Sequence, residues 1–319
     1  MWRRREALQA LWSMSALGNA GVAGVAMAST TDAASASSRP GRVERISLFP
    51  SQHVAARHVD IWLPGDYSPQ RRYRVLYMHD GQMLFDPSST WNGQAWLAQV
   101  RVHDLVSQSR IAQTLIVGIW NNGPQRYAEY YPQKFLDFAP QAVRAEYEKR
   151  AANGRLQSDA YLRFIVEELK PTIDRRYATD SGPDATVVAG SSMGGLISLY
   201  ALCEYPRVFG AAAALSTHWV GLPTAWGLET VRASVLPQAA LAYLRQYLPS
   251  PGRHRLYSDR GTDALDSSYT AGHDGFEQLL RERGYTSAQA RTAVFEGTGH
   301  NETDWSQRLA IPLQFVLGT

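Results

Sequence analysis

Cysteine is almost absent from this sequence, with Cys203 as the single one among 319 residues. No intramolecular disulfide can form, so the fold has to rest on its hydrophobic core. We expect Cys203, which falls in a helical pattern, to be a buried core residue. Beyond residue 28 no stretch reaches the about 18 apolar residues of a membrane-spanning helix, so stable membrane insertion is not expected.

The sequence also lacks an excess of charge of either sign, because it has 32 Lys and Arg and 29 Asp and Glu. The resulting net charge of +3 is partly carried by the basic N-terminus. A protein that binds nucleic acid usually carries a pronounced basic patch, and nothing here predicts one. We therefore expect no nucleic-acid partner, and no sequence feature indicates an oligomeric state.

The N-terminus has the pattern of an export signal. A basic start, Met1–Arg5, precedes a mildly apolar segment poor in charge, and Ala26-Met27-Ala28 fits a cleavage site. Residues 1–28 are therefore predicted to be a signal peptide, which implies a periplasmic or secreted protein. Arg4-Arg5 also fits the twin-arginine pattern, with a Sec signal as the alternative. Residues 29–42 are rich in Ser, Ala and Thr and predict a disordered linker.

Residues 43–319 are predicted to form a single α/β catalytic domain. Predicted strands cover 58–64, 73–78, 114–119, 187–191, 211–215, 253–258 and 291–295. Predicted helices cover 91–106, 142–152, 160–169 with Pro171 beyond, the stretch after Gly195, 231–248, 275–283, and 304–317 with a break near Pro312. This alternation predicts a mostly parallel sheet with helices on both faces and an antiparallel N-terminal edge. Residues 121–154 form an unusually long connection, which predicts a cap-like insertion beside the active site.

The run Gly190-Ser191-Ser192-Met193-Gly194 follows an apolar strand and precedes a helical pattern. This order predicts a nucleophile elbow, in which Ser192 lies at the tip of a sharp strand-to-helix turn. Side chains at Gly190 and Gly194 would collide with neighbouring backbone in such a turn. The N–H of Met193 would then help to bind an oxyanion.

A serine nucleophile needs a base and an acid, and in α/β-hydrolases the chain order is Ser, Asp or Glu, His. His300 follows the last predicted strand in a glycine-flanked loop and is the predicted base. Asp263 and Asp266 both lie in the preceding loop; we favour Asp266 and keep Asp263 as the alternative acid. Asp259 falls in or beside the strand. His273, a weaker rival to His300, is predicted to lie on the surface.

The second oxyanion donor is expected in the loop after residues 73–78, where His79-Asp80-Gly81-Gln82 follows the strand. We predict that Gln82 donates through its backbone N–H and that Gly81 allows the turn. His79 and Asp80 are predicted to support the loop rather than to take part in catalysis. An aromatic wall suited to sugars or phenolic acyl groups is a further prediction. Its candidates are Trp91, Trp120, Tyr127, Tyr130, Tyr131, Trp219 and Trp226.

These motifs together resemble the bacterial putative-esterase family, which includes enterochelin esterases, feruloyl esterases, S-formylglutathione hydrolases and mycolyltransferases. The resemblance runs from about residue 54 to the C-terminus. Four motifs carry it: Tyr77-Met78-His79-Asp80-Gly81-Gln82-Met83-Leu84-Phe85-Asp86, Thr90-Trp91-Asn92-Gly93, Gly190-Ser191-Ser192-Met193-Gly194-Gly195 and Gly299-His300-Asn301-Glu302.

The resemblance implies an α/β-hydrolase fold, no metal or cofactor, and attack of Ser192 on an ester carbonyl. The expected substrate is a small-molecule or glycan-linked ester, with Trp91, Arg126, Tyr130 and Trp219 as candidate binding residues. A carbohydrate-linked or phenolic ester is the first expectation, and a siderophore ester the alternative. An acyltransferase and a non-catalytic binding protein on the same fold are the remaining alternatives.

Overall fold

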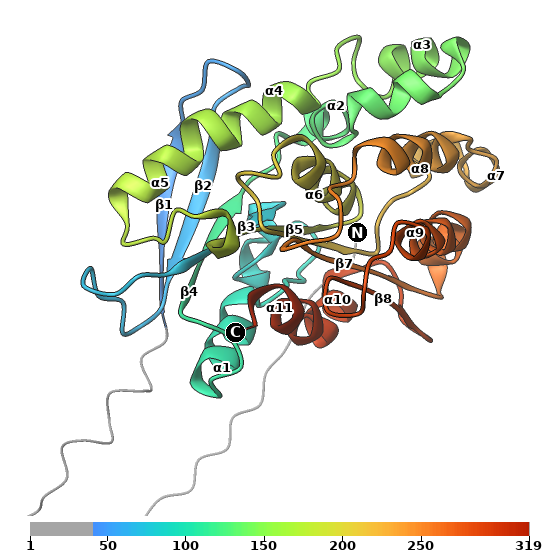
Figure 1. The fold of residues 1–319 in the computed structure, drawn as a ribbon. Helices are drawn as coiled ribbons and strands as arrows, with labels where there is room; N and C mark the ends of the chain where they lie inside the picture. Colours follow the sequence, from blue (N-terminus) through green and yellow to red (C-terminus); the bar gives the residue numbers. More distant parts are fainter. Residues whose placement is uncertain (1–40, 319) are drawn as a thin grey trace, which may run out of the picture. The chain divides into compact units, whose positions relative to one another are not determined.

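An eight-stranded sheet of order β1-β2-β4-β3-β5-β6-β7-β8 runs through the computed structural model, which describes residues 41–318 (Figure 1). The strands are β1 (Arg42–Phe49), β2 (Arg57–Leu63), β3 (Arg74–His79), β4 (Thr114–Ile119), β5 (Thr186–Ser191), β6 (Ala211–Leu215), β7 (Arg255–Gly261) and β8 (Ala290–Phe295). β1 begins at the last residue of the predicted linker. The predicted signal peptide and most of the linker lie outside the described residues.

The pairing of the strands confirms the predicted sheet. β1 with β2 and β2 with β4 are antiparallel. From β4 through β3 to β8 every neighbouring pair is parallel. Parallel strands need helical crossovers, which place helices on both faces of the sheet. The prediction of an antiparallel N-terminal edge on a mostly parallel sheet is therefore correct.

Helices cover both faces of this sheet (Figure 1). The α-helices are α1 (Ala98–Ser107), α2 (Arg126–Tyr130), α3 (Gln141–Arg150), α4 (Ser158–Arg163), α5 (Lys170–Arg176), α6 (Met193–Glu204), α7 (Leu228–Arg232), α8 (Leu236–Tyr247), α9 (Thr270–Glu282), α10 (Glu302–Arg308) and α11 (Ala310–Leu317). A π-helical turn (Phe164–Leu169) joins α4 to α5, and short 3-10 turns include η1 (Gly81–Met83), η3 (Gly123–Gln125), η4 (Gln133–Phe138) and η8 (Ala264–Tyr269).

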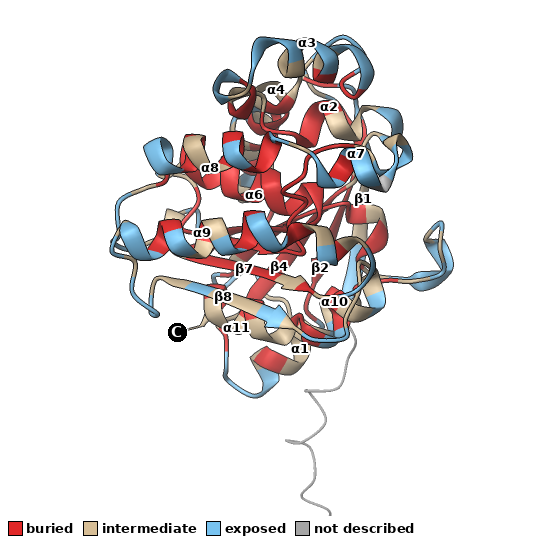
Figure 2. Ribbon diagram, turned by 90° about the vertical axis from the view of Figure 1, so that its right-hand side faces the viewer, coloured by how far each residue is buried: buried red, intermediate tan, exposed pale blue. Residues whose placement is uncertain are grey.

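Two hydrophobic cores lie on opposite faces of the sheet, because successive strand residues point to opposite sides. In β3, Val75 and Tyr77 join one core, while Leu76 and Met78 join the other. The larger core packs α2 to α6, α8 and α9, and the smaller one packs α1, α10 and α11. Figure 2 shows the buried residues concentrated on the strands and on α6 between the outer helices.

The structure corrects the predicted helix limits at prolines and at α1. The helix predicted to stop before Pro171 continues to Arg176, because the π-helical turn just before it changes the hydrogen-bonding register. The predicted helix 231–248 is two helices, with Pro237 in the first turn of α8. The C-terminal break falls at Leu309 rather than at Pro312. The helix predicted from residue 91 starts only at Ala98.

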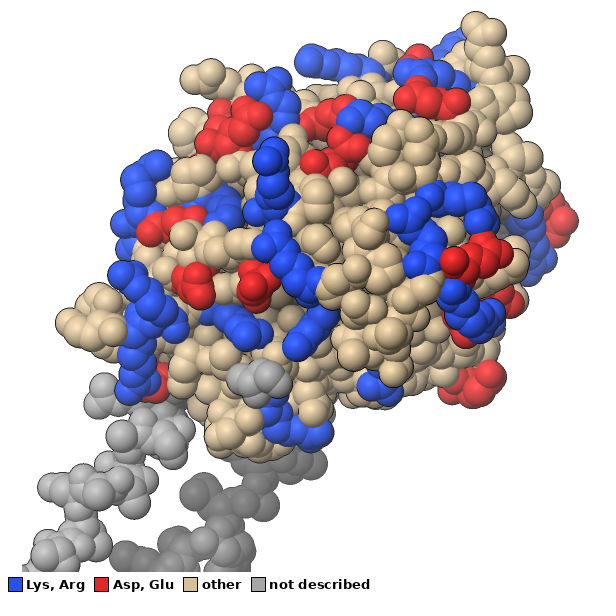
Figure 3. Space-filling view, viewed as in Figure 1, with Lys and Arg blue, Asp and Glu red and all other residues tan. Residues whose placement is uncertain are grey.

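The surface carries both signs of charge. On the face shown in Figure 3, Lys and Arg side chains are interspersed with Asp and Glu. Several pairs are helical neighbours four residues apart, such as Arg150 with Glu146 and Arg281 with Glu277. Exposed pairs of this kind contribute little to stability. Within residues 41–318, no helix combines the length and hydrophobicity needed to cross a bilayer. Cys203 is buried, as predicted.

Candidate active site

The carboxyl ends of the parallel strands meet at one edge of the sheet, where ligands of α/β proteins commonly bind. β3 ends at His79, β5 leads into Ser192, and β6 leads into Ser216. β7 and β8 end at Gly261 and Phe295, and the loops after them carry the remaining predicted residues. The topology therefore brings together the ends of five strands that are far apart in the sequence.

Ser192 occupies a strained backbone conformation between β5 and α6. Its φ of 58° and ψ of −125° lie in a region that side chains rarely adopt. A Cβ on Gly190 would lie 2.9 Å from the carbonyl carbon and oxygen of Gly194, so the predicted collision with backbone is correct there. At Gly194 the nearest atom would instead be the side-chain Cβ of His79, at 3.3 Å. This geometry matches the sharp turn of a nucleophile elbow.

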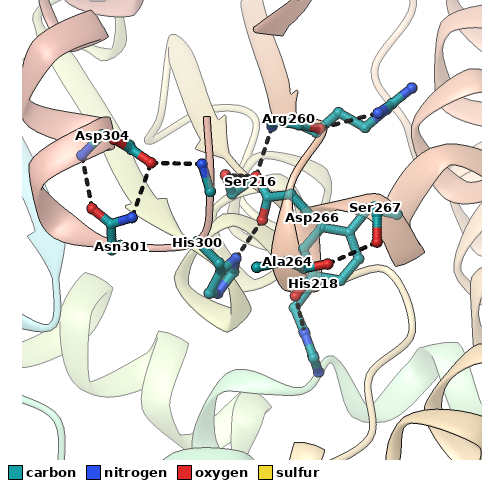
Figure 4. A network of polar contacts seen from close by, with 12 residues as sticks. Ser216, His218, Arg260, Ala264, Asp266, Ser267, His300, Asn301 and Asp304 are labelled. Atoms are coloured by element: carbon teal, nitrogen blue, oxygen red, sulfur yellow. Dashed lines mark hydrogen bonds and ion pairs between the residues drawn. The ribbon is translucent and has the colours of Figure 1, made fainter. Parts of the chain in front are cut away.

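His300 and Asp266 point toward each other across the loops after β8 and β7 (Figure 4). The Nδ1 atom of His300 lies 2.6 Å from Oδ1 of Asp266. Asp266 is 0% exposed, whereas Asp263 is an exposed residue whose carboxylate accepts a hydrogen bond from Thr262. The difference arises because η8 begins after Asp263 and turns Asp266 inward. Among the described residues, His300 is hydrogen-bonded only through Nδ1, so its Nε2 is free of such bonds.

The Asp266 carboxylate is held by three donors. Oδ2 accepts hydrogen bonds from the Ser216 hydroxyl and, at 2.7 Å, from the Gly261 N–H, in addition to the His300 contact at Oδ1. Burial by itself would raise the pKa of the Asp266 carboxyl. The hydrogen bonds from His300, Ser216 and Gly261 outweigh that effect, so its pKa lies below the ordinary value. The carboxylate is thereby kept ionised despite its complete burial.

A buried ion pair lies directly behind Ser216. Arg308 of α10 contacts both carboxylate oxygens of Asp259 at 3.1 and 3.2 Å, and both side chains are buried. Arg308 also donates to the Ser216 hydroxyl at 2.8 Å and to the Thr298 hydroxyl at 3.1 Å. Burial raises the pKa of Asp259, and Arg308 opposes that rise. Asp259 thus lies in β7 as predicted and is paired with an arginine that the sequence analysis did not single out.

Tyr269 and His218 complete the surroundings of Ser192. The Nε2 atom of the buried His218 lies 2.9 Å from the carbonyl oxygen of Leu222, which can only accept, so Nε2 carries the proton. Burial lowers the pKa of His218 to about 3 and keeps its ring neutral. Nδ1 then accepts from the Tyr269 hydroxyl. The Tyr269 ring also packs edge-on against the His300 ring. Neither residue has a sequence signal beyond its position after β6 or in η8.

The loop after β3 is held by charged contacts from the insertion, residues 121–154. The carboxylate of Asp80 accepts two hydrogen bonds from Arg126, both at 2.8 Å, and one from the Asn121 amide at 2.7 Å. Burial favours a higher pKa for Asp80, but Arg126 and Asn121 more than offset it, and the pKa is lowered. The His79 ring lies 2.8 Å from the Tyr161 hydroxyl, and burial lowers its pKa to about 3. Both residues therefore have structural contacts of the predicted kind.

The left-handed residue of this turn is Asp80, with φ of 56°. Gly81 is required for a different reason, since a Cβ there would lie 2.5 Å from the carbonyl carbon of Gly118 in β4. Gln82 and Met193 lie in the first turns of η1 and α6, where backbone N–H groups have no acceptor within their own helix. Among the described residues no acceptor outside these helices binds them either. Both are therefore free to bind an oxyanion.

The four candidate substrate residues lie in different environments. Trp91 is 84% exposed, whereas Trp219 is 1% exposed and packs against Phe276, so Trp219 is a core residue. Tyr130 is fully buried, and its hydroxyl accepts from the Asp80 N–H. Arg126 is committed to Asp80. The predicted aromatic wall is therefore wrong for its buried members, because these side chains fill the core.

The remaining aromatic candidates and His273 complete the comparison. Tyr127 is half-buried and packs edge-on against the His218 ring. Tyr131 is buried, and Trp120 donates to Asp60. Trp226 is stacked with Arg150 at 4.0 Å. His273, predicted on the surface, is buried within α9, and burial lowers its pKa to about 4. Within residues 41–318, no cluster of three or more His, Cys, Asp or Glu side chains is arranged to hold a metal ion.

The fold and this edge of the sheet define an α/β-hydrolase. The sequence profile of the family described as "Putative esterase" matches residues 54–315. The chain belongs to this family, and by class it is a carboxylic ester hydrolase.

Several known proteins are similar to this chain in sequence or in fold. The chain is 22% identical to the uncharacterized protein YbbA of Bacillus subtilis, over 84% of this chain and 96% of that protein. It is 27% identical to the ferri-bacillibactin esterase BesA of the same organism, over 51% of this chain and 54% of BesA. A ferulic acid esterase structure superposes with a TM-score of 0.59 and 19% identity, covering 88% of this chain and 99% of that one. The structure of the Shigella flexneri enterobactin esterase FES superposes with a TM-score of 0.59 and 17% identity, covering 88% of this chain and 59% of that one.

Proposed function

We propose that the protein is a serine carboxylesterase in which Ser192 is the nucleophile, His300 the base and Asp266 the acid. The observation that carries this proposal is the fully buried Asp266 carboxylate 2.6 Å from His300 Nδ1, at the sheet edge that also bears the strained Ser192. Asp263 is not chosen, because its exposed carboxylate has no contact with His300.

The proposed reaction proceeds through an acyl-enzyme. Asp266 fixes the proton of His300 on Nδ1, which leaves Nε2 to take the Ser192 proton as Oγ attacks the ester carbonyl. The oxyanion binds to the N–H groups of Met193 and Gln82. His300 then protonates the leaving alcohol, and a water molecule, activated by the same Nε2, releases the acid. For the first step the Ser192 hydroxyl has to donate to Nε2 of His300, the ring nitrogen that does not face Asp266.

The proposed substrate is a phenolic or carbohydrate-linked ester. A cavity of about 390 Å³ lies between α3 of the insertion and residues 222–236, and Tyr147, Leu222 and Trp226 are among its lining residues. Its wall is tied to the site through His218. The Leu222 carbonyl oxygen accepts from the His218 ring, and the backbone N–H of His218 donates to the Ser192 carbonyl oxygen. A mainly apolar cavity of this size suits an aromatic group.

A siderophore ester is the second candidate, favoured by the similarity to BesA and FES. Methyl ferulate, acetylated xylan and a catecholate trilactone, assayed side by side, separate the two substrate classes. Transfer to an added alcohol instead of water would identify an acyltransferase.

Replacement of Ser192 tests the chemistry itself. Ser192→Ala is expected to abolish hydrolysis of p-nitrophenyl acetate and labelling by a fluorophosphonate, while the melting temperature stays close to that of the wild type. Ser191→Ala is the matched control on the neighbouring residue. Turnover of Ser192→Ala near the wild-type rate, or wild-type protein that the probe does not label, would contradict the proposal and favour a non-catalytic binding role.

Export is the remaining part of the proposal and rests on the sequence of residues 1–28. Expression in a bacterial host followed by fractionation and N-terminal sequencing is expected to give a periplasmic or secreted protein that starts at Ser29. Replacing Arg4 and Arg5 by Lys would block a twin-arginine signal and leave a Sec signal working. A cytoplasmic protein that retains Met1 would refute export.

A further inference from the structure

Ser216 is the first residue after β6, and its hydroxyl has all three of its hydrogen-bonding positions occupied. The hydroxyl oxygen accepts from Trp305 Nε1 at 2.9 Å and from Arg308 Nη2 at 2.8 Å. Its remaining neighbour is Oδ2 of Asp266, which can only accept when it is ionised. The hydroxyl hydrogen is therefore directed at Asp266, and the orientation follows from the donors alone.

The backbone of Ser216 is fixed as firmly as its side chain. Its φ of 41° lies in the left-handed region, which is unusual for a serine. The Ser216 N–H donates to Oδ1 of the buried Asp259 at 2.9 Å, and Asp259 is paired with Arg308. Arg308 thus holds Ser216 in two ways. It binds the Ser216 hydroxyl directly, and it anchors the Asp259 carboxylate that accepts from the Ser216 N–H.

We propose that Ser216 is a positioning residue, which Arg308 and Trp305 orient so that it holds the Asp266 carboxylate in register with His300. The inference rests on the proposed function, because it assigns Ser216 a role only if Asp266 serves His300. Trp305 and Arg308 belong to α10, which begins two residues after His300. Trp305 also packs edge-on against the His300 ring, with ring centroids 4.9 Å apart. The loop that carries the base and the helix that orients Ser216 are therefore neighbours in the chain.

Loss of the Ser216 hydroxyl should lower the rate through Asp266. It also leaves Trp305 Nε1 and Arg308 Nη2 without their acceptor, which lowers the stability of the fold in either background. Without this donor the carboxylate keeps two of its three hydrogen bonds and can turn away from His300. Misplacement of a catalytic group by about 1 Å costs on the order of a hundredfold in rate. Ser216→Ala is therefore expected to lower kcat for p-nitrophenyl acetate about 10- to 100-fold, with KM changed less than about threefold because the ester itself does not touch Ser216.

A double-mutant cycle with Asp266→Ala separates this role from a general structural one. Once Asp266 is absent, Ser216 has nothing to position, so Ser216→Ala should lower kcat less than about threefold in that background. A structural role would give the same loss in both backgrounds.

Two further variants keep the test decisive. Ser258→Ala is the matched control, because Ser258 is buried on the neighbouring strand β7 and its hydroxyl has no hydrogen-bond partner within residues 41–318. This variant should retain wild-type kcat. If Ser216→Ala fails to fold, Ser216→Gly replaces it, since glycine adopts a positive φ without strain.

The inference is overturned if Ser216→Ala and Ser216→Gly keep kcat within threefold of the wild type, or if the loss is equal with and without Asp266. The proposed function fails separately, through Ser192→Ala or Asp266→Ala that remain active.

Discussion

Replacing Asp266 by asparagine tests the assignment of the acid, because the structure dictates how the new amide must lie. The Oδ2 position faces two donors, the Gly261 N–H and the Ser216 hydroxyl. The amide oxygen of the asparagine must occupy this position, since an NH₂ group there would face donors only. The NH₂ group is then directed at Nδ1 of His300, 2.6 Å away in the native pair.

An amide donor facing Nδ1 forces His300 into the opposite tautomer. Nδ1 must then accept, the proton moves to Nε2, and Nε2 can no longer take the proton of Ser192. The corresponding change in serine proteases lowers kcat by roughly ten thousandfold, which corresponds to about 5 kcal/mol at 1.36 kcal/mol per factor of ten. We expect Asp266→Asn to lose kcat for p-nitrophenyl acetate by about a thousandfold to ten-thousandfold.

The matched control is Asp263→Asn, which changes the same functional group three residues away. Asp263 is exposed and contacts Thr262, so its replacement should leave kcat within about twofold of the wild type and the melting temperature almost unchanged. We would measure steady-state rates of both variants at several pH values and verify folding by circular dichroism. These rates decide which aspartate is the acid. A larger loss for Asp263→Asn, or less than a tenfold loss for a folded Asp266→Asn, would refute the tautomer argument.

Three further outcomes are expected. Gly190→Ala places a Cβ 2.9 Å from the Gly194 backbone and should lower the free energy of unfolding by about 1–3 kcal/mol in urea titrations. An unchanged free energy of unfolding would contradict this prediction, because it would mean that the turn around Ser192 moves to accommodate the methyl group. Arg126→Leu leaves the buried Asp80 carboxylate without its cation and should lower the free energy of unfolding by about 2–4 kcal/mol, less than for a fully buried pair because Arg126 is partly exposed. It should also lower kcat. A stable, fully active variant would contradict the support that Arg126 gives to the proposed oxyanion loop. The pKa of Asp80 is lowered on folding, so its ionised form stabilises the fold at pH values above its ordinary pKa of 3.8, and this contribution is lost as the pH falls through the folded pKa. Acid unfolding should therefore be less steep in Asp80→Asn than in the wild type. Identical acid titrations of both proteins would contradict this prediction.

Local patterns predicted the parts of this molecule that depend on local structure. The elbow around Ser192 combines a short apolar run, small residues and a helical pattern, and all three are visible within twenty residues. His300 follows a short strand in a glycine-flanked loop. The order of the sheet followed in outline from the alternation of strands and helices, because parallel strands require crossovers.

What the sequence could not predict depends on contacts between distant segments. No sequence pattern distinguishes Asp263 from Asp266, because both lie in the same loop. The start of η8 after Asp263 decides which of them points inward. Ser216 carries a weak signal, its position directly after a buried strand, whereas Arg308 carries none. Trp219 fits a binding wall as well as a core until the close contact with Gly272 places it inside. Side-chain direction in a loop is thus set by packing partners that no spacing rule identifies.

The contacts of Asp80 with Asn121 and Arg126 divide the insertion into two parts with different freedom to change. Its first residues hold the loop after β3, which is the proposed oxyanion loop. Further along the insertion, α3 helps to line the cavity beside residues 222–236. An exchange of residues 132–154 with those of a relative would alter the walls around the substrate and leave Asn121 and Arg126 on Asp80. Substrate range could thus diversify within this family by recombination of one short segment, with the chemistry at Ser192 carried through each exchange.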